Sequence, residues 1–230
     1  MNVVILQPSY IPWRGYFDQI RRADLFVFYD DVQYDKRGWR NRNQIKTASG
    51  KQWLTIPVYS HGAQTQNIPI NEICIVWEQP WNQQHYKALQ HAYGSAPHFK
   101  RFLPLLAEFY ERRDEYLADF TIYTTIALAH ALGLVHTRFM RSSEIEGISG
   151  QKTDRLIQIL QHVGASHYIS GPAAKDYIEA EKFDAAGISL EFMEYNYPEY
   201  PQLYPPFDPF VSVLDLLFMT GPEALKYIEG

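Results

Sequence analysis

The sequence has one cysteine, Cys74, in 230 residues, so no disulfide can form within the chain. It also lacks, at its start, the charged segment followed by an apolar one that a secretory signal needs. The most apolar stretch, residues 120–135, is broken by threonines, a tyrosine and a histidine, and it is shorter than the roughly 20 apolar residues of a membrane helix. These absences predict a cytoplasmic protein without a targeting segment or a membrane span.

Signatures of common enzyme classes are missing as well. The eight histidines do not fall at zinc-binding spacing with cysteines, and the sequence has neither a Walker loop nor a G-x-S-x-G elbow. The formal net charge of -5 gives no overall attraction to nucleic acid. The P-loop and serine-hydrolase classes and bulk nucleic-acid binding are therefore disfavoured, and any basic patch has to be local.

Short apolar runs alternate with helical patterns along much of the chain. With 46% apolar residues, the chain is long enough for one sizeable core, so we expect a single α/β domain over residues 1–230. The expected strands are residues 3–6, 25–29, 137–140, 167–170 and 188–193. Helical patterns at residues 16–23 and 151–163 predict a five-stranded, doubly wound, mostly parallel sheet of the Rossmann-like kind.

Three segments fall outside this alternation. Residues 43–45 and 53–58 flank the turn-forming residues 48–51 and predict a β-hairpin. Residues 78–133 carry about three helical patterns, and we expect them to form a helical insertion or layer within the same domain. The aromatic and proline-rich residues 195–209 predict an ordered loop that packs through its aromatic side chains.

The loop after the first expected strand gathers amide and aromatic side chains. In an open parallel sheet, ligands bind beyond the carboxyl ends of the strands, where this loop would lie. Its side chains suit a planar ring or a sugar, and its glycine would let an anion approach the start of the following helix. The alternative is that the aromatic residues only pack the loop against the sheet. The candidate ligand-binding residues are Gln7, Pro8, Tyr10, Trp13 and Gly15.

Two adjacent carboxylates follow the second expected strand. Because side chains alternate in direction along a strand, only one of Asp30 and Asp31 should face the ligand site. We expect that carboxylate to bind a hydroxyl, an amine or Mg²⁺, with Asp31 as the catalytic candidate and Gln33 as a further ligand contact. The alternative is that both carboxylates form surface ion pairs with the basic residues that follow, which would contribute little stability.

The densest basic cluster of this acidic chain lies at the start of the expected hairpin. Arginine holds phosphate or carboxylate through two parallel hydrogen bonds, and a neighbouring tryptophan can stack on a base or on a sugar face. The cluster therefore predicts phosphate recognition, with a solvated basic hairpin as the alternative. Its candidate residues are Arg37, Trp39, Arg40, Asn41, Arg42, Asn43 and Lys46, of which Arg40 is the catalytic candidate.

A third candidate segment follows the expected strand at residues 167–170. Ser170 and Gly171 precede a proline that suits a first helical turn, so the backbone amides and Lys175 would form a second anion site at the same edge of the sheet. The motif alone is only a good helix start, and its position at this edge gives it weight. Ser142 and Ser143 occupy the equivalent edge after the preceding strand.

Several motifs in the same order give a resemblance to a known family. They are residues 7–17 (QPSYIPWRGYF), 28–34 (FYDDVQY), 37–46 (RGWRNRNQIK), 53–58 (WLTIPV), 170–177 (SGPAAKDY) and 207–218 (FDPFVSVLDLLF). On these motifs the sequence resembles the WbqC-like protein family from Val3 to Phe218. One departure is Leu6, where the family often has a histidine before the Gln-Pro pair, so a mechanism that needs a base at this position is not expected here.

The resemblance implies a role in bacterial surface-polysaccharide (O-antigen) biosynthesis. It implies an enzyme that transfers an acyl or aminoacyl group, such as glycyl, to an amino sugar, with a sugar nucleotide or a nucleotide-activated intermediate as an option. A small-molecule substrate is then the expected partner, and the oligomeric state is left open. Two alternatives are plain nucleotidylyl transfer and a non-catalytic module that binds a nucleotide sugar.

A weaker similarity concerns residues 13–16, which open a helix where nucleotidylyltransferases and class I aminoacyl-tRNA synthetases carry His-x-Gly-His. This similarity implies that the expected sheet is HUP-like or nucleotidylyltransferase-like. Gly15 agrees with that pattern, whereas both histidines are replaced. A nucleotide could then bind over Gly15, but basic residues would have to stabilise the phosphate in place of imidazole. The similarity implies phosphate neutralisation by Arg40, Arg42 and Lys175, with Asp31 on Mg²⁺ or an amino group.

Overall fold

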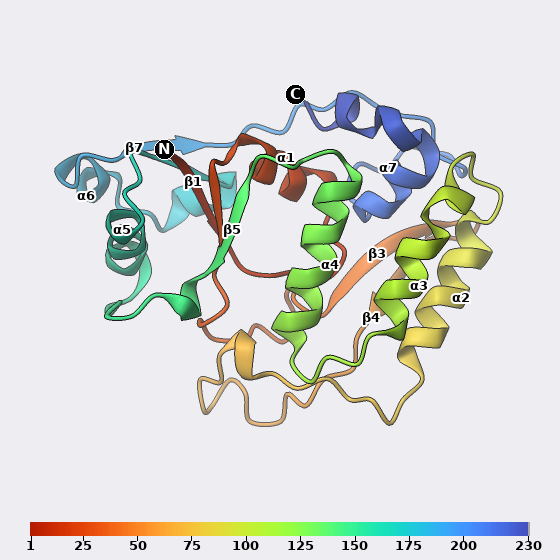
Figure 1. Cartoon of the computed structure of the whole chain (residues 1–230), viewed down its shortest axis with the longest axis horizontal. Coiled ribbons are helices and arrows are strands. Elements are labelled where there is room, and N and C mark those ends of the chain that lie inside the picture. The colour runs from red at the N-terminus through yellow and green to blue at the C-terminus, as the bar shows by residue number, and fades with distance from the viewer. Residues whose placement is uncertain (230) are drawn as a thin grey trace.

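The computed structural model describes residues 1–229, and its central feature is a five-stranded parallel sheet of order β5-β2-β1-β6-β7 (Figure 1). Every neighbouring pair in the sheet is parallel. This confirms the α/β, Rossmann-like sheet predicted from the alternation of strands and helices. The strands are β1 (Asn2–Leu6), β2 (Leu25–Phe28), β5 (Arg138–Arg141), β6 (His167–Ser170) and β7 (Ser189–Phe192).

The two faces of the sheet belong to two different apolar clusters, because side chains alternate along each strand. Val4 of β1 packs in the cluster that contains the apolar side chains of α1 (Arg14–Arg22). Val3 and Ile5 pack instead in the cluster that contains those of α5 (Lys152–His162) and α6 (Ala180–Ala185). The inner strands are therefore buried on both faces, as is usual for parallel sheets.

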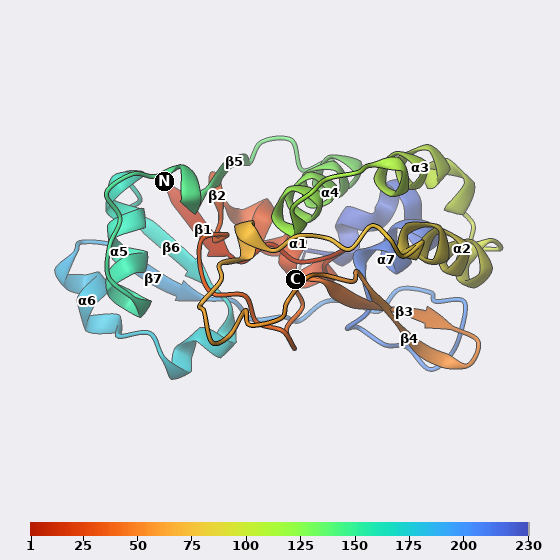
Figure 2. The same ribbon diagram turned by 90° about the horizontal axis from the view of Figure 1, so that it is seen from below.

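The direction of winding changes between β1 and β6. The chain passes from β1 through α1 to β2 on one face, and it returns from β5 through α5 to β6 on the other face (Figure 2). The loops after β1 and β6 consequently diverge to opposite faces of the sheet. In doubly wound folds, this switch point leaves a crevice at the carboxyl ends of the strands.

A β-hairpin and a helical layer lie together on one side of the sheet (Figure 1). The hairpin is confirmed, with its first strand at β3 (Arg42–Thr47) and its second at β4 (Gly50–Thr55). The second strand ends before residue 57, where a proline has no N–H for a ladder hydrogen bond. The layer comprises α2 (Trp81–Tyr93), α3 (Leu103–Glu111), α4 (Leu117–Ala131) and α7 (Val213–Thr220).

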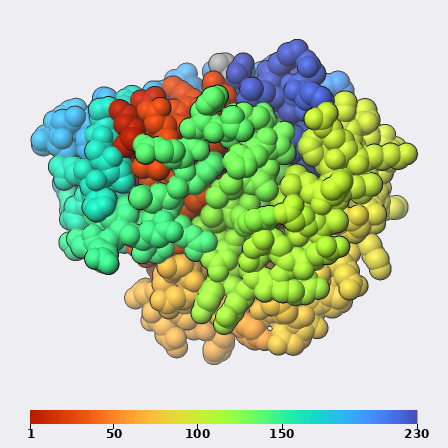
Figure 3. Space-filling model, viewed as in Figure 1, coloured from red at the N-terminus to blue at the C-terminus, as the bar shows by residue number. Residues whose placement is uncertain are grey.

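A buried polar contact joins the hairpin to these helices. The Tyr93 hydroxyl of α2 donates to the Asp215 carboxylate of α7 at 2.9 Å, and it accepts from the Lys46 backbone N–H of β3 at 2.9 Å. The helices predicted within residues 78–133 are α2, α3 and α4, and α4 lies in the middle of the face seen in Figure 3.

Short 3-10 helices connect the longer elements. They are η1 (Ile70–Glu72), η2 (Phe99–Phe102), η3 (Ser142–Glu144), η4 (Pro172–Asp176) and η5 (Gly221–Tyr227). The helix expected to begin after Gly171 is thus a single 3-10 segment, η4, and the α-helix on that connection begins only at Ala180. Across residues 1–229, no helix combines the length and the apolar character that crossing a membrane requires.

Candidate functional site

A cavity of about 840 Å³ opens at the carboxyl ends of β1 and β6, where the direction of winding changes. Leu6 and Gln7 reach it from the end of β1, and Ser170 and Gly171 reach it from the end of β6. The volume falls in the range of small-molecule sites, roughly 300–1,000 Å³. Its position is the one that doubly wound folds use for ligands.

Eight of the residues predicted for the site line this cavity. They are Gln7, Trp13, Gln33, Trp39, Arg40, Asn43, Ser170 and Gly171. They come from the loops after three strands and from the start of the hairpin, which are far apart in the sequence. The fold therefore brings together members of each candidate segment.

Arg40 is the cation of the cavity that is most deeply enclosed by protein. Its Nη1 donates to the Pro8 carbonyl at 3.3 Å, while its Nε is buried and has no hydrogen-bond partner. No carboxylate of residues 1–229 lies within ion-pair distance of the guanidinium. Burial lowers the pKa of Arg40, yet an arginine remains charged at neutral pH. A partly buried charge that contacts no carboxylate directly is suited to an anionic ligand.

Asn43 holds the loop after β1 against the hairpin. Its Nδ2 donates to the Tyr10 carbonyl at 3.2 Å and to the Ile11 carbonyl at 2.9 Å. Ile11 has φ of 36°, a left-handed conformation that is rare for a β-branched residue. Because such strain persists only where the surroundings enforce it, Asn43 acts as a positioning residue for this loop.

Trp13 forms an aromatic wall of the cavity just before α1. Its ring meets Tyr195 edge-on at 4.9 Å between ring centroids and lies 5.7 Å from the ring of Phe210. The indole also lies over Gly15, where an added Cβ would be only 2.3 Å from the Trp13 ring. Gly15 itself does not line the cavity, and its lack of a side chain makes room for Trp13.

We expect Gly15→Ala to displace the Trp13 ring and to weaken ligand binding about tenfold, since one aromatic stacking contact is worth about 1–3 kcal/mol. The fold should survive, because Ala is favoured over Gly inside a helix by up to about 1 kcal/mol. Calorimetric titration and thermal unfolding measure the two effects. Trp13→Ala is the matched comparison, and a Gly15→Ala protein that binds like the wild type while Trp13→Ala does not would contradict this role.

The two carboxylates after β2 lie outside the cavity lining and are bound to other protein groups. Asp30 is fully buried and accepts hydrogen bonds from the Ser143 N–H at 3.1 Å and from the Ser143 hydroxyl at 2.9 Å. Burial raises the pKa of Asp30 in spite of these bonds. Asp31 accepts from the Ser142 hydroxyl at 2.6 Å and pairs with Arg155 at 2.5 Å. Neither carboxylate lines the cavity, so a Mg²⁺ ion at Asp31 would have to compete with Arg155.

The other basic candidates are engaged elsewhere. Arg42 stacks on Trp53 at 4.4 Å and donates to the Arg37 carbonyl, and the Arg37 side chain is exposed. Lys46 is buried and donates to Gln202 at 2.6 Å. Lys175 is exposed and lies over the Phe192 ring at 5.5 Å. None of these four predicted residues, Arg37, Arg42, Lys46 and Lys175, lines the cavity.

The remaining candidates support the walls from behind. The buried Tyr10 hydroxyl contacts the Tyr110 hydroxyl at 2.7 Å and His85 Nδ1 at 2.9 Å. Asn41 donates to the Ile56 carbonyl at 2.8 Å, which ties the start of the hairpin to its end. Pro8 is buried and supplies the carbonyl that Arg40 contacts. These residues lie outside the cavity lining and shape it indirectly.

The structure adds lining residues that were not among the predicted site residues, although some lie in the candidate segments. They are chiefly Tyr16, Gln19, Tyr29, Lys152, Leu156, Tyr168, Tyr177, Tyr195 and Phe210. Tyr29 directly follows β2 and could have been found by the rule that strand ends face the ligand. Lys152 carried no such signal, because nothing in the sequence shows that the start of α5 reaches this edge of the sheet.

The cavity offers hydrogen-bond donors, aromatic faces and two cations. Among its described lining residues there is no aspartate, glutamate, histidine or cysteine. Burial raises the pKa values of Tyr29 and Tyr195 to about 12, so both hydroxyls stay protonated at neutral pH. The lining can therefore bind and orient an anionic, partly planar molecule, and its described residues include no carboxylate, histidine or cysteine that could act as a general base.

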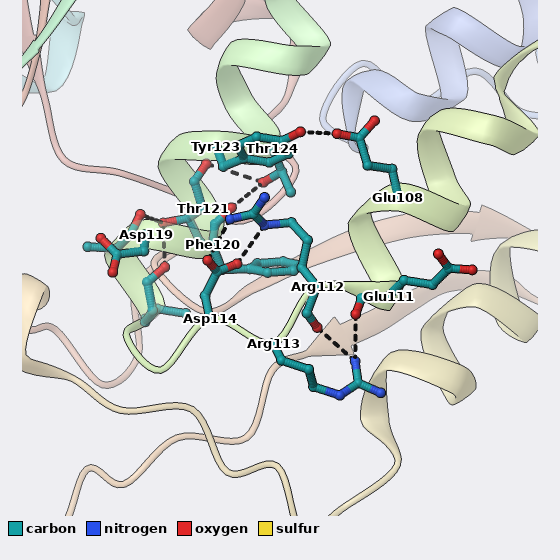
Figure 4. Close-up of polar contacts among 12 residues, drawn as sticks. Glu108, Glu111, Arg112, Arg113, Asp114, Asp119, Phe120, Thr121, Tyr123 and Thr124 are labelled. Atoms are coloured by element: carbon teal, nitrogen blue, oxygen red, sulfur yellow. Dashed lines mark hydrogen bonds and ion pairs between the residues drawn. The ribbon is translucent and has the colours of Figure 1, made fainter.

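A second cavity, of about 470 Å³, lies beside α4 and β5. Its charges are already paired, since Arg112 contacts Asp114 at 2.5 Å and Arg141 contacts Asp119 at 2.7 Å. Figure 4 shows Arg112 beside Asp114 near Tyr123, whose hydroxyl donates to Glu108. Because both arginines of this cavity are already paired with carboxylates, it is the weaker candidate for an anionic ligand.

Comparison with known proteins identifies the family to which this protein belongs. The model of the WbqC-like protein family matches residues 7–227. The uncharacterized protein Rv1507c of Mycobacterium tuberculosis is 41% identical over 230 residues, which cover 99% of this chain and 97% of that protein. No solved structure gives a significant match. Since the family match runs from the loop after β1 to η5 and so covers nearly the whole chain, the chain belongs to the WbqC-like protein family.

Proposed function

We propose that this protein binds a sugar nucleotide in the cavity at the ends of β1 and β6 and acts in surface-polysaccharide biosynthesis. The proposed reaction is the transfer of an acyl or aminoacyl group, such as glycyl, to an amino sugar. The proposal that the cavity binds a sugar nucleotide rests on Arg40. This cation lines the cavity, and no carboxylate in residues 1–229 lies within ion-pair distance of it. The proposal that the protein transfers an acyl or aminoacyl group rests on the resemblance of the sequence to the family.

Phosphate recognition by Arg40 is supported by its neighbours in the cavity. Trp13 and Trp39 add indole faces on which a base can stack, and Trp39 keeps 45% of its surface exposed. Gln7 adds an amide group that can pair with a polar edge, while the amide of Asn43 is already bound to the loop after β1. Aromatic faces, amides and a lone guanidinium together match the three parts of a nucleotide better than they match a purely apolar ligand.

Acyl transfer to an amine suits this lining, because it needs fewer catalytic side chains than the other reactions considered. The amine nitrogen attacks the carbonyl carbon of an activated ester or thioester; the C–N bond forms, the bond to the carrier breaks, and the amine proton goes with the leaving group. Such a reaction can be accelerated mainly by holding the two reactants together and by donors placed at the carbonyl oxygen. Tyrosine and amide groups supply such donors here.

The same lining also favours a second candidate, a non-catalytic module that binds a nucleotide sugar. The specific observation is the lack of aspartate, glutamate, histidine and cysteine among the described lining residues. Plain nucleotidylyl transfer is supported less, because Mg²⁺ is commonly held by carboxylates and both Asp30 and Asp31 are bound to other partners.

Titration of the purified protein with nucleotides, sugar nucleotides and amino acids tests the proposal. We expect a sugar nucleotide to raise the unfolding temperature and to bind more tightly than the free sugar, because phosphates contact Arg40. Mass spectrometry with an aminoacyl ester or thioester donor then detects the acylated sugar. Binding without acylation would favour the binding module, release of pyrophosphate from a nucleoside triphosphate would favour nucleotidylyl transfer, and no binding would reject the proposal.

A further inference from the structure

The cavity has two chemically different walls, because it lies across the edge of the sheet. The α1-side wall consists of residues from the α1 face and the hairpin, namely Trp13, Tyr16, Gln19, Arg40 and Asn43. The α5-side wall consists of Ile5, Tyr29, Lys152, Leu156, Tyr168 and Tyr177. The ends of β1 and β6 separate the two walls, and residues from both line one continuous cavity.

The α1-side wall combines an arginine with amide side chains. Gln19 is 96% buried, since only 4% of its surface is exposed, and its Nε2 donates to the Tyr195 hydroxyl at 3.0 Å. Its Oε1 is buried without a partner. Amides present donor and acceptor groups together, which is what the edge of a nucleobase requires. Arg40 belongs to this wall, so the phosphates have their place next to it.

The α5-side wall offers hydroxyls and one ammonium group instead. The residues that line the cavity between positions 152 and 177 include no amide and no carboxylate side chain. Tyr168 is held in place by the parallel ring of Phe183, at 5.5 Å and 4° between planes. Its hydroxyl accepts from Ser170 Oγ at 3.4 Å. Tyrosine faces and hydroxyls suit a hydroxyl-rich sugar ring, whose C–H groups pack on aromatic rings.

The wall is also supported from behind by the carboxylate of Asp31. Its partner Arg155 lies over the ring of Tyr29, 5.9 Å from the ring centroid. Asp31 therefore acts on the cavity indirectly: it holds Arg155, and Arg155 packs on Tyr29, which lines the cavity. This gives the ion pair after β2 a structural part in the α5-side wall, although neither of its members lines the cavity.

We infer that the ligand lies across the ends of β1 and β6, with its nucleoside and phosphates on the α1-side wall and its sugar on the α5-side wall. Tyr177 and Lys152 are then sugar-binding residues at the opening of the cavity, where Tyr177 is 59% exposed and Lys152 is exposed as well. The inference rests on the proposed function, and it adds the orientation of the ligand and a separate subsite for the sugar.

Paired ligands with and without the sugar test this orientation. The pairs are UDP with UDP-N-acetylglucosamine, GDP with GDP-mannose, and TDP with TDP-glucose, each measured by calorimetric titration. We expect the wild type to bind one sugar nucleotide at least about tenfold more tightly than its diphosphate. Tyr177→Ala and Lys152→Ala should remove most of that gain and leave the affinity for the diphosphate within about twofold. Tyr59→Ala is the matched control, because Tyr59 is equally exposed, at 58%, and does not line the cavity.

The other possible results distinguish a wrong ligand orientation from a wrong proposed function. If either variant weakens the diphosphate as much as the sugar nucleotide, or changes neither affinity, the orientation is overturned and the proposed function stands. The orientation also fails if the wild type binds both members of a pair equally well. If no pair binds to the wild type, the proposed function fails with it. Thermal unfolding of each variant shows that the fold is kept, which the exposure of both side chains leads us to expect.

Discussion

Arg40→Ala is expected to weaken the binding of a sugar nucleotide about 100-fold without unfolding the protein. The guanidinium lines the cavity, its Nε has no partner, and its one hydrogen bond to protein, at 3.3 Å to the Pro8 carbonyl, is long. A charge-assisted hydrogen bond contributes about 1.5–3 kcal/mol, and 1.4 kcal/mol corresponds to a factor of ten in affinity. Calorimetric titration measures the loss directly.

The loss of affinity in Arg40→Ala should be seen only for ligands that contain phosphate. Ligands that lack phosphate, such as the free amino sugar, should bind equally weakly to the wild type and to Arg40→Ala. Raising the salt concentration should weaken binding to the wild type more than binding to the variant, because the interaction is between opposite charges. Arg40→Lys should recover only part of the affinity, since an ammonium group lacks the planar, two-pronged geometry of a guanidinium.

Arg42→Ala is the matched control for this prediction. It removes the same charge from the same segment, but its guanidinium stacks on Trp53 at 4.4 Å and does not line the cavity. We expect the affinity of Arg42→Ala to stay within about threefold of the wild type, as fits a charge outside the site. Equal losses in the two variants would show that the basic cluster acts through its overall charge, and no loss in Arg40→Ala would remove Arg40 from the site.

Acidification should destabilise the protein through His85, by about 3 kcal/mol between pH 6.5 and pH 4. Burial lowers the pKa of His85 from an ordinary value of 6.5 to about 4 in the folded protein. In this range the unfolded chain binds a proton that the folded protein does not bind. Stability is therefore complete above pH 6.5 and falls as the pH falls toward 4, at 1.36 kcal/mol per pH unit.

The surroundings of His85 explain why the neutral form is favoured. The ring lies in α2 among Tyr10, Trp81 and Tyr110, and its Nδ1 is 2.9 Å from the Tyr10 hydroxyl. A positive charge at this place would lose its hydration without gaining a carboxylate partner. Because Tyr10 belongs to the loop after β1, protonation of His85 is also expected to disturb the wall that contains Trp13.

Urea unfolding of the wild type and of His85→Gln from pH 7 to pH 4 checks this prediction. The buried carboxylates of Asp30 and Asp215 have raised pKa values and change stability in the opposite sense over part of this range. Both proteins share them, so the difference between the two pH profiles isolates His85. His136→Gln, at an exposed histidine, should keep the wild-type profile. Parallel profiles for wild type and His85→Gln would contradict the assignment.

The strands and their order along the chain could be predicted because each is a short, continuous apolar run. Leu25–Phe28 is buried at all four positions, and such runs are typical of strands covered on both faces. The hairpin was predicted from its turn, and the helices of residues 78–133 from their periodicity. The order β5-β2-β1-β6-β7 was not predicted, since it depends on pairing between segments more than 100 residues apart.

For the candidate site, the sequence predicted the right segments but not which residues of each segment face the cavity. Trp39 and Arg40 reach the cavity, whereas Asn41 and Arg42 next to them are turned to the hairpin. A run of basic and amide residues cannot show which of its members faces a ligand, because that depends on where β3 begins and on what packs behind it. In the same way, Asp30 and Asp31 lie at a strand end, as expected, but serines and Arg155 from distant segments engage both.

The sequence by itself determined the family, the α/β class and the segments that end at the ligand edge of the sheet, since these depend on local patterns of apolar residues and on short motifs within one chain. Only the tertiary structure decided that the cavity lies between β1 and β6, that Arg40 is its enclosed cation, and that Lys152 and Tyr177 join it. The physical reason is that burial and charge pairing are set by neighbours in space, which crossovers on opposite faces of the sheet bring together.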